Sequence, residues 1–351
     1  MTSPLTPSEI RDLRANQPQM RERDFARIHK ISEAQLVAAH VGGSATRLDI
    51  DISAILEGAR TLGTVMALTR NESAVHEKIG PYEKVLVGAH NAMVLGEQID
   101  LRIFQGKWAS GFAVTKQGED GPKHSLQFFD AAGDAVHKIH LRPESDLDAY
   151  QALVAKLRSA DQSAEQATGA VADVEAVDAT RPQADADALR DAWSRLTDTH
   201  QFFGMLRDLN LPRHQALRMV GPEYVRQVAT DAVETMFNLV VDNGLPLMAF
   251  VGNTGCIQIH SGPVHKVARM GPWLNVMDET FHMHLRTDHI EHAYVVRKPT
   301  SAGFVSSLEA YDAGGKLIIQ FFGKRIEGHD ERPLWRETLA ALPEINATAA
   351  A

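Results

Sequence analysis

The chain has 351 residues, a length that suggests about two folded units, each able to bury its own core. Apolar residues make up 44% of it and charged residues 23%, a balance typical of globular proteins and not of disordered or fibrous ones. The net charge of −9 supplies no basic surface for a phosphate backbone, so nucleic acid is not an expected partner.

The first 27 residues are polar and mixed in charge. They lack the apolar run of a secretory signal, and no later stretch is long and apolar enough for a membrane span. The sequence therefore predicts a cytoplasmic protein that does not insert into a membrane.

The first half begins with helical segments and continues as strands. Ser32 precedes the segment 33–36 and predicts a helix N-cap. Stretches rich in apolar, β-branched or aromatic residues then predict strands at 84–89, 101–104, 111–115 and 125–129, and residues 130–133 predict a turn. Because successive strands are close in sequence, antiparallel hairpins are favoured over helical crossovers.

Residues 159–188 differ in composition from everything around them. They are dominated by Ala, Asp, Glu, Gln and Ser, with few bulky apolar residues. Such a stretch has no apolar stripe with which to dock on a core. It predicts a flexible, solvent-exposed linker between a first unit, residues 1–158, and a second unit, residues 189–351.

The second unit repeats the first. Met66 aligns with Met248, and the same register continues without a gap to Arg142, carrying the predicted turn at 130–133 onto residues 312–315. Only roughly a fifth of the aligned positions are identical, but a single register over this length indicates a duplication. The sequence thus predicts an α+β fold in two tandem copies, each with helices followed by an antiparallel sheet.

The segment 193–207 opens the second copy and is predicted to be helical. His200, Phe203, Gly204 and Arg207 would share one face, because they are three, four and seven positions apart. An imidazole beside an aromatic ring, a bare backbone and a cation suits a flat, anionic ligand that carries a metal. The alternative is a histidine at the edge of the core, the usual fate of a histidine on a helix.

The chain resembles the hemin-degrading factor family, the cytoplasmic proteins of bacterial haem uptake. The likeness covers nearly the whole chain and is carried by five separated motifs in order, at residues 66–80, 199–206, 252–260, 269–275 and 320–325. The second of these reads Thr-His-Gln-Phe-Phe-Gly-Met-Leu. The duplicated architecture with a linker between the halves is also the one that this resemblance implies.

The resemblance implies a haem b site made of particular residues. His200 matches the axial ligand of the iron, and Arg102 matches an arginine on the opposite side, with Phe104 lining the pocket. Groups near the propionates and edge of the haem are matched by Arg213, Lys298, Gln320 and Arg325. The two propionates also need local cations on an acidic protein, for which Arg207, Arg213 and Arg325 are candidates.

We expect a single haem between the halves, with His200 facing Arg102. The reason is that Arg102 aligns with His284 across the repeat, so the two copies have diverged there. An arginine within an apolar, strand-like run also tends to need a partner or a ligand.

Two functions are compatible with such a site. One is an enzyme that opens the haem macrocycle and releases iron, with electrons from an external donor, because the chain shows no flavin or nicotinamide motif. The other is a haem chaperone that takes haem from an inner-membrane importer and delivers it to a separate haem oxygenase.

Other candidate side chains are interpreted structurally. The histidines at 282, 284, 289 and 292 have a spacing that can hold zinc, but no carboxylate or cysteine completes a recognisable motif, so a solvated strand is favoured over a zinc-dependent protein. His214 is interpreted as a surface histidine and alternatively as a second haem ligand. Cys256, the only cysteine, is expected to be a buried strand residue.

Overall fold

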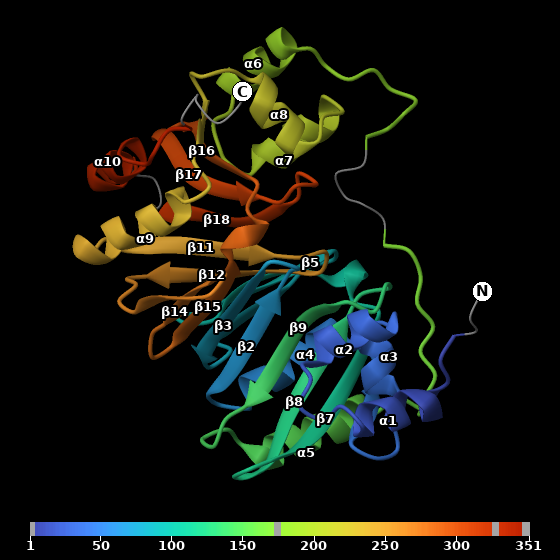
Figure 1. Ribbon diagram of the computed structural model, residues 1–351. Coiled ribbons are helices and arrows are strands. Elements are labelled where there is room, and N and C mark those ends of the chain that lie inside the picture. The colour runs from blue at the N-terminus through green and yellow to red at the C-terminus, as the bar shows by residue number, and fades with distance from the viewer. Residues whose placement is uncertain (1–3, 172–176, 325–329, 346–351) are drawn as a thin grey trace. The chain divides into compact units, whose positions relative to one another are not determined.

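The computed structural model describes residues 4–171, 177–324 and 330–345 (Figure 1). The chain forms two compact units, and each takes a short segment from the other half of the sequence. Unit 1 comprises residues 1–70, 77–171 and 252–258, and unit 2 comprises residues 71–76, 172–251 and 259–351. The division differs from one at the linker alone, because β3 (Ala74–Gly80) and β12 (Cys256–Gly262) each begin in one unit and end in the other.

Unit 1 begins with helices and continues with a run of strands, as the sequence predicts, but α4 follows the first strand and α5 follows the last. Its helices are α1 (Pro7–Ala15), α2 (Glu22–His29), α3 (Glu33–Ala38), α4 (Ile52–Arg60) and α5 (Leu147–Leu157). Its strands are β1 (Ala45–Leu48), β2 (Val65–Arg70), β4 (Lys84–Val87), β5 (Asn91–Leu95), β6 (Asp100–Phe104), β7 (Ser110–Gly118), β8 (Gly121–Phe129) and β9 (Ala135–Leu141), with the 3-10 turn η1 (Gln105–Lys107). They pair antiparallel in the orders β1-β7-β8-β9-β2 and β4-β5-β6.

Unit 2 repeats this plan. Its helices are α6 (Ala186–Ser194), α7 (Gln201–Asp208), α8 (Arg213–Met219), α9 (Ala232–Asp242) and α10 (Pro333–Ala340). Its strands are β10 (Val225–Val228), β11 (Leu247–Gly252), β13 (Val267–Met270), β14 (Trp273–Met277), β15 (Phe281–Arg286), β16 (His292–Thr300), β17 (Gly303–Tyr311) and β18 (Leu317–Gly323), with the 3-10 turn η2 (Thr287–His289). The antiparallel orders are β10-β16-β17-β18-β11 and β13-β14-β15.

The duplication predicted from the sequence is confirmed by the positions of the strands. β2 and β11 begin 182 residues apart, and so do β3 and β12, β5 and β14, β7 and β16, β8 and β17, and β9 and β18. The turn predicted at residues 130–133 is also present: the N–H of Gly133 donates to the carbonyl of Asp130, and Gly133 takes a φ of +83°. Its counterpart Gly315 has a φ of +76°, so both positions favour glycine.

Three local expectations hold as well. Ser32 caps α3 in a capping box with Gln35. The predicted strands are present, although β7 and β8 extend beyond the predicted segments to the hairpin at Gly118 and Gly121. Cys256 is fully buried at the start of β12.

The ends of the linker segment are attached to the folded units. Residues 159–171 lie along Arg47, whose guanidinium donates to the carbonyls of Ser163 and Glu165 at 3.0 and 2.7 Å. Toward the other end, the side chain of Asn210 accepts from the N–H of Asp178 and donates to its carbonyl, at 2.8 and 2.9 Å. The linker residues that the structure describes are mostly exposed, in keeping with their polar composition.

A separate small core in unit 2 positions the segment that contains His200. Helices α6, α7 and α8 pack together over β16 (Figure 1), and Trp193, Phe202, Leu206, Leu217 and Val296 are among the buried residues of this core. Burial of each large side chain contributes roughly 1.5–3 kcal/mol. Among the described residues, no helix is long and apolar enough to cross a membrane.

Candidate functional site

The prediction of one continuous helix over residues 193–207 is wrong. α6 ends at Ser194, and α7 begins only at Gln201, after a turn. The polar side chains of the turn replace the helical hydrogen bonds: Gln201 Oε1 accepts from the N–H groups of Thr197 and Asp198, at 3.0 and 3.3 Å. Short polar residues favour such local bonds, which compete with the helix.

The predicted face nevertheless exists, because His200 is the N-cap of α7 with helical backbone angles, φ −69° and ψ −21°. The helix buries Phe202 and Leu206 and turns its other side outward. Phe203 is 58% exposed, the side chain of Arg207 is 80% exposed, and a Cβ added to Gly204 would meet nothing within 4 Å. The four residues therefore present an open surface with a ring, a bare backbone and a cation.

The imidazole of His200 is held at one of its nitrogens. Its side chain is 94% exposed, and Nδ1 lies 2.7 Å from Oδ1 of Asp198. Among the described residues, Nε2 has no hydrogen-bond partner, so it is the nitrogen available to a ligand. A neutral imidazole with an open nitrogen is a common axial ligand of haem iron.

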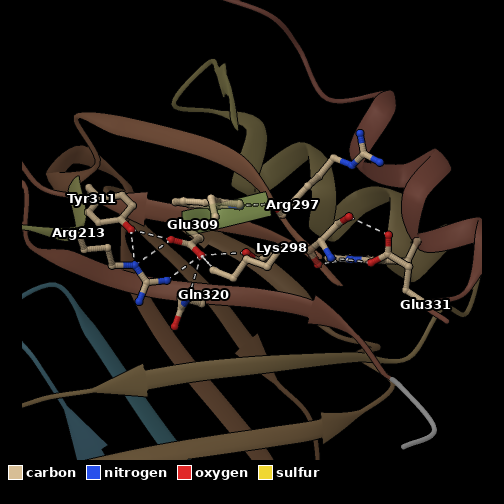
Figure 2. A network of polar contacts seen from close by, with 11 residues as sticks. Arg213, Arg297, Lys298, Glu309, Tyr311, Gln320 and Glu331 are labelled. Carbon is tan, nitrogen blue, oxygen red and sulfur yellow. Dashed lines mark hydrogen bonds and ion pairs between the residues drawn. The ribbon is translucent and has the colours of Figure 1, made fainter. Parts of the chain in front are cut away.

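Beside α7 lies a buried cluster of polar side chains centred on Glu309, which comes from β17 (Figure 2). Its carboxylate is fully buried and accepts from Arg213 Nη2 at 2.7 Å, from Lys298 Nζ at 3.1 Å and from Gln320 Nε2 at 3.0 Å. The hydroxyl of Tyr311 donates to the other carboxylate oxygen at 2.6 Å. Three predicted site residues, Arg213, Lys298 and Gln320, are thus brought together by one carboxylate.

Two cations, Arg213 and Lys298, pair with the one carboxylate of Glu309. Burial alone would raise the pKa of Glu309, but Arg213 and Lys298 hold it below its ordinary value. Burial lowers the pKa of Lys298 to about 8, against the opposing effect of Glu309. Burial also raises the pKa of Tyr311, which stays a neutral donor. The two buried cations favour an anion nearby.

Aromatic rings connect this cluster with α7. The guanidinium carbon of Arg213 lies 5.3 Å from the ring centroid of Phe202 and 5.6 Å from that of Phe203. Lys298 Nζ lies 4.5 Å from the Phe202 centroid. Phe203 therefore lies against Arg213 on one side and is exposed on the other, so an anionic ligand on this helix would lie within the field of that cation.

The described residues of unit 1 form no equivalent cluster. In the register of the repeat, Gln127 occupies the position of Glu309. Glu33, which begins α3 as Arg213 begins α8, reverses the sign of the charge and pairs with Arg70 and Lys138. The two copies have thus diverged, and the cationic cluster beside an open histidine belongs to unit 2.

Two further predicted residues lie in unit 1, on β6. Arg102 and Phe104 are half-buried on the face opposite Leu101 and Ile103, which are fully buried. The sequence leads us to expect a partner or a ligand for Arg102. In the structure, Arg102 forms an ion pair with Asp100 and donates to the carbonyl of Leu101 at 3.1 Å. Arg325 lies outside the described residues.

The remaining histidines are dispersed over several elements. His214 is not a plain surface residue, because its ring stacks on Tyr311 and on His292 with centroids 5.2 and 4.9 Å apart. His284 Nδ1 lies 2.6 Å from Oδ1 of Asn275, and His289 Nδ1 lies 2.9 Å from Oγ of Ser73. Within the described ranges, no three potential metal-ligating side chains of His, Cys, Asp or Glu converge.

Sequence reasoning missed Asp198, Glu309 and Tyr311. The signal for the last two is their alternation on β17, where Ser307, Glu309 and Tyr311 are polar at every second position while Leu308 and Ala310 are apolar. On a strand buried on both faces, such polar residues must pair with one another. The signal for Asp198 is its place two residues before the candidate ligand.

Comparison with known proteins identifies the family. The model of the haemin-degrading HemS.ChuX domain matches residues 30–157 and again residues 210–342. The hemin transport protein HmuS of Yersinia pestis is 38% identical over 330 residues, which cover 94% of each chain.

Two solved structures share the fold over nearly the whole chain. Holo-PhuS, a heme-binding protein from Pseudomonas aeruginosa, has a TM-score of 0.93 and 42% identity, covering 97% of this chain and 100% of its own. ChuS, an E. coli heme oxygenase, has a TM-score of 0.86 and 35% identity, covering 94% and 98%. The duplicated α+β architecture, the two domain matches and these similarities together show that the chain belongs to the HemS.ChuX family of haemin-degrading proteins.

Proposed function

We propose that this protein binds one haem b through His200 and opens the macrocycle oxidatively, releasing iron for bacterial use in the cytoplasm. The observation that carries the proposal is the exposed imidazole of His200, with Nε2 open, beside the exposed ring of Phe203. The relative from E. coli is described as a heme oxygenase, and the one from P. aeruginosa as a heme-binding protein.

The residues of unit 2 fit haem in chemistry. His200 supplies a neutral nitrogen ligand, Phe203 an apolar surface for the ring, and Gly204 a place where the macrocycle can lie against the backbone. The two cations of the Glu309 cluster favour the anionic propionates, and Gln320 and exposed Arg207 supply further donors. Arg325 keeps the role at the haem edge that the resemblance implies.

The proposal gives Arg102 the task of stabilising negative charge that develops on oxygen during the reaction. The resemblance carries this assignment, together with the pocket-lining role of Phe104. A guanidinium is suited to it because it remains protonated at physiological pH and donates in a fixed geometry. Bound haem supplies the redox chemistry, and an external donor supplies the electrons.

Haem trafficking is a second candidate function. The Yersinia relative is described as a hemin transport protein, and a ligand side chain that is 94% exposed suits release to another protein. In that function, an inner-membrane importer delivers haem and a separate haem oxygenase accepts it.

Product analysis separates the two functions. The protein is loaded with haemin without oxygen and then given a reductant and oxygen, with catalase present to remove free peroxide. A tetrapyrrole product and released iron, identified by chromatography and mass spectrometry, support degradation. Recovery of intact haem, with transfer to an apo-protein acceptor, contradicts degradation and supports trafficking. Loss of the haem absorption band alone does not count, because free peroxide bleaches haem without an enzyme.

A further inference from the structure

We propose that Asp198 is a positioning residue, which fixes the tautomer and the orientation of His200 so that Nε2 is presented to the iron. The inference deepens the proposed function and rests on it. The proposed role belongs to the turn between α6 and α7 and adds no residue of α7 to the site.

The geometry places one carboxylate oxygen on two groups of the same histidine. Asp198 Oδ1 lies 2.7 Å from the backbone nitrogen of His200 and 2.7 Å from its Nδ1. The first contact fixes the backbone from which the ring projects, and the second fixes the rotation of the ring. Both distances are short, as is typical of bonds in which one partner is charged.

The backbone of Asp198 is itself held by the turn. Gln201 Oε1 accepts from the N–H of Asp198 at 3.3 Å, and Gln201 Nε2 donates to Oγ1 of Thr197 at 3.1 Å. The N–H of Gln201 in turn donates to the carbonyl of Asp198 at 3.2 Å. The aspartate is thus positioned before any ligand arrives.

The contact decides which nitrogen carries the proton. An ionised carboxylate has only acceptors, so the ring can bond to it only through an N–H at Nδ1. In the neutral ring, the lone pair then lies on Nε2, the nitrogen with no partner among the described residues. An imidazole without this partner divides itself between two tautomers, and one of the two presents an N–H to the metal and cannot ligate it.

A bound macrocycle would strengthen the pair. In the free protein both side chains are open to water, with 94% and 57% of their surfaces exposed, so water competes for the bond. Bound haem would exclude some of that water, and the interaction of the carboxylate with the imidazole would grow as the local dielectric falls. Carboxylate partners of this kind orient metal-binding histidines and make them more basic.

Nitrogen NMR of the protein without haem tests the tautomer directly. Long-range proton–nitrogen spectra of the His200 ring in the wild-type protein should show a protonated Nδ1 and an unprotonated Nε2. In Asp198→Ala, the ring should shift toward a mixture of tautomers. Identical His200 signals in the two proteins would overturn the inference, because no property of haem enters this measurement.

Haem titration supplies the second readout. We expect Asp198→Ala to weaken haemin binding about tenfold, at the lower end for lost metal-ligand partners because the pair is exposed. In Asp198→Asn, which retains an acceptor but loses the charge, the iron–histidine stretching frequency of ferrous haem should fall and the reduction potential should rise. The control is Asp191→Ala, which removes another exposed carboxylate, on α6 and paired with Arg195. Its haemin affinity and spectra should match those of the wild-type protein.

The failure of this inference is distinguishable from failure of the proposed function. If His200→Ala leaves the haem spectrum unchanged, another residue ligates the iron and the proposed function loses its ligand. If His200→Ala changes the spectrum while Asp198→Ala and Asp198→Asn both behave as the wild-type protein does, His200 is the ligand and Asp198 does not position it.

Discussion

The buried carboxylate of Glu309 joins the polar cluster of unit 2 and is a sensitive site for substitution. Glu309→Gln keeps the size of the side chain but replaces one acceptor oxygen by an NH₂ group, which cannot accept from Arg213 or Lys298. Both cations are almost completely buried, at 2% and 3% exposed, so the substitution removes the carboxylate of Glu309 from two cations in the interior.

Breaking a buried ion pair by removing one partner costs about 3–5 kcal/mol. We expect a loss of this size in the free energy of unfolding of unit 2. Guanidinium unfolding followed by tryptophan fluorescence measures it, because Trp193 and Trp335 are both fully buried in this unit. The matched control is Glu291→Gln, an exposed position beside β16, which should change stability by less than about 0.5 kcal/mol.

A second substitution separates charge from shape. Adding Lys298→Met to Glu309→Gln removes one of the two buried cations that have lost the carboxylate of Glu309, so the double variant should recover part of the lost stability. A Glu309→Gln protein that unfolds within about 1 kcal/mol of the wild-type protein would refute the account of the cluster as a buried ion-pair network.

Three other predictions concern the ligand and the linker. Arg102→Ala should bind haemin nearly as well as the wild-type protein but form product more slowly or by another route, and equal products at equal rates with catalase present would exclude the proposed role. Because burial lowers the pKa of Lys298 to about 8, the Glu309 cluster loses positive charge as pH rises through that value. Haemin affinity should therefore fall across this range in the wild-type protein but not in Lys298→Met, and parallel pH profiles would contradict the electrostatic role. Asn210→Gly accommodates the φ of +56° but removes the side-chain bonds to Asp178 and Arg181. The endoproteinase Asp-N should therefore cut before Asp178 faster than in the wild-type protein, and an unchanged rate would show that these bonds do not hold the segment.

The duplication could be predicted because it leaves a register in the sequence. A gap-free alignment from Met66 to Arg142 predicts equal spacing of the strands, and the structure shows that spacing. The predicted turns, the N-cap at Ser32 and the burial of Cys256 are local consequences of residue type and need no tertiary information.

The turn before His200 could not be predicted from the helical spacing of the sequence. The spacing of His200, Phe203, Gly204 and Arg207 fits one helix, and α7 shows it. The break before His200 depends instead on side-chain bonds within the turn, in which Gln201 accepts from the N–H groups of Thr197 and Asp198. The exchange of short segments within β3 and β12 also depends on tertiary pairing, which no local pattern records.

The burial of Arg213 could not be predicted from its own neighbourhood. Its carboxylate partner lies 96 residues further along the chain, on another element. The resemblance to the family indicates that the arginine at this position is functional. Whether its guanidinium is solvated or paired depends on which strand packs beneath α8. The same is true of His214, whose stacking partners Tyr311 and His292 are distant in sequence.

The ferric absorption spectrum of His200→Ala tests the central claim most directly. Haemin titration of the wild-type protein should saturate at one equivalent per chain, with the bands of histidine-ligated haem. His200→Ala should bind more weakly and show changed Soret and visible bands, while His214→Ala should retain those of the wild-type protein. A His200→Ala protein that saturates at the same haemin concentration with an unchanged spectrum would contradict the account.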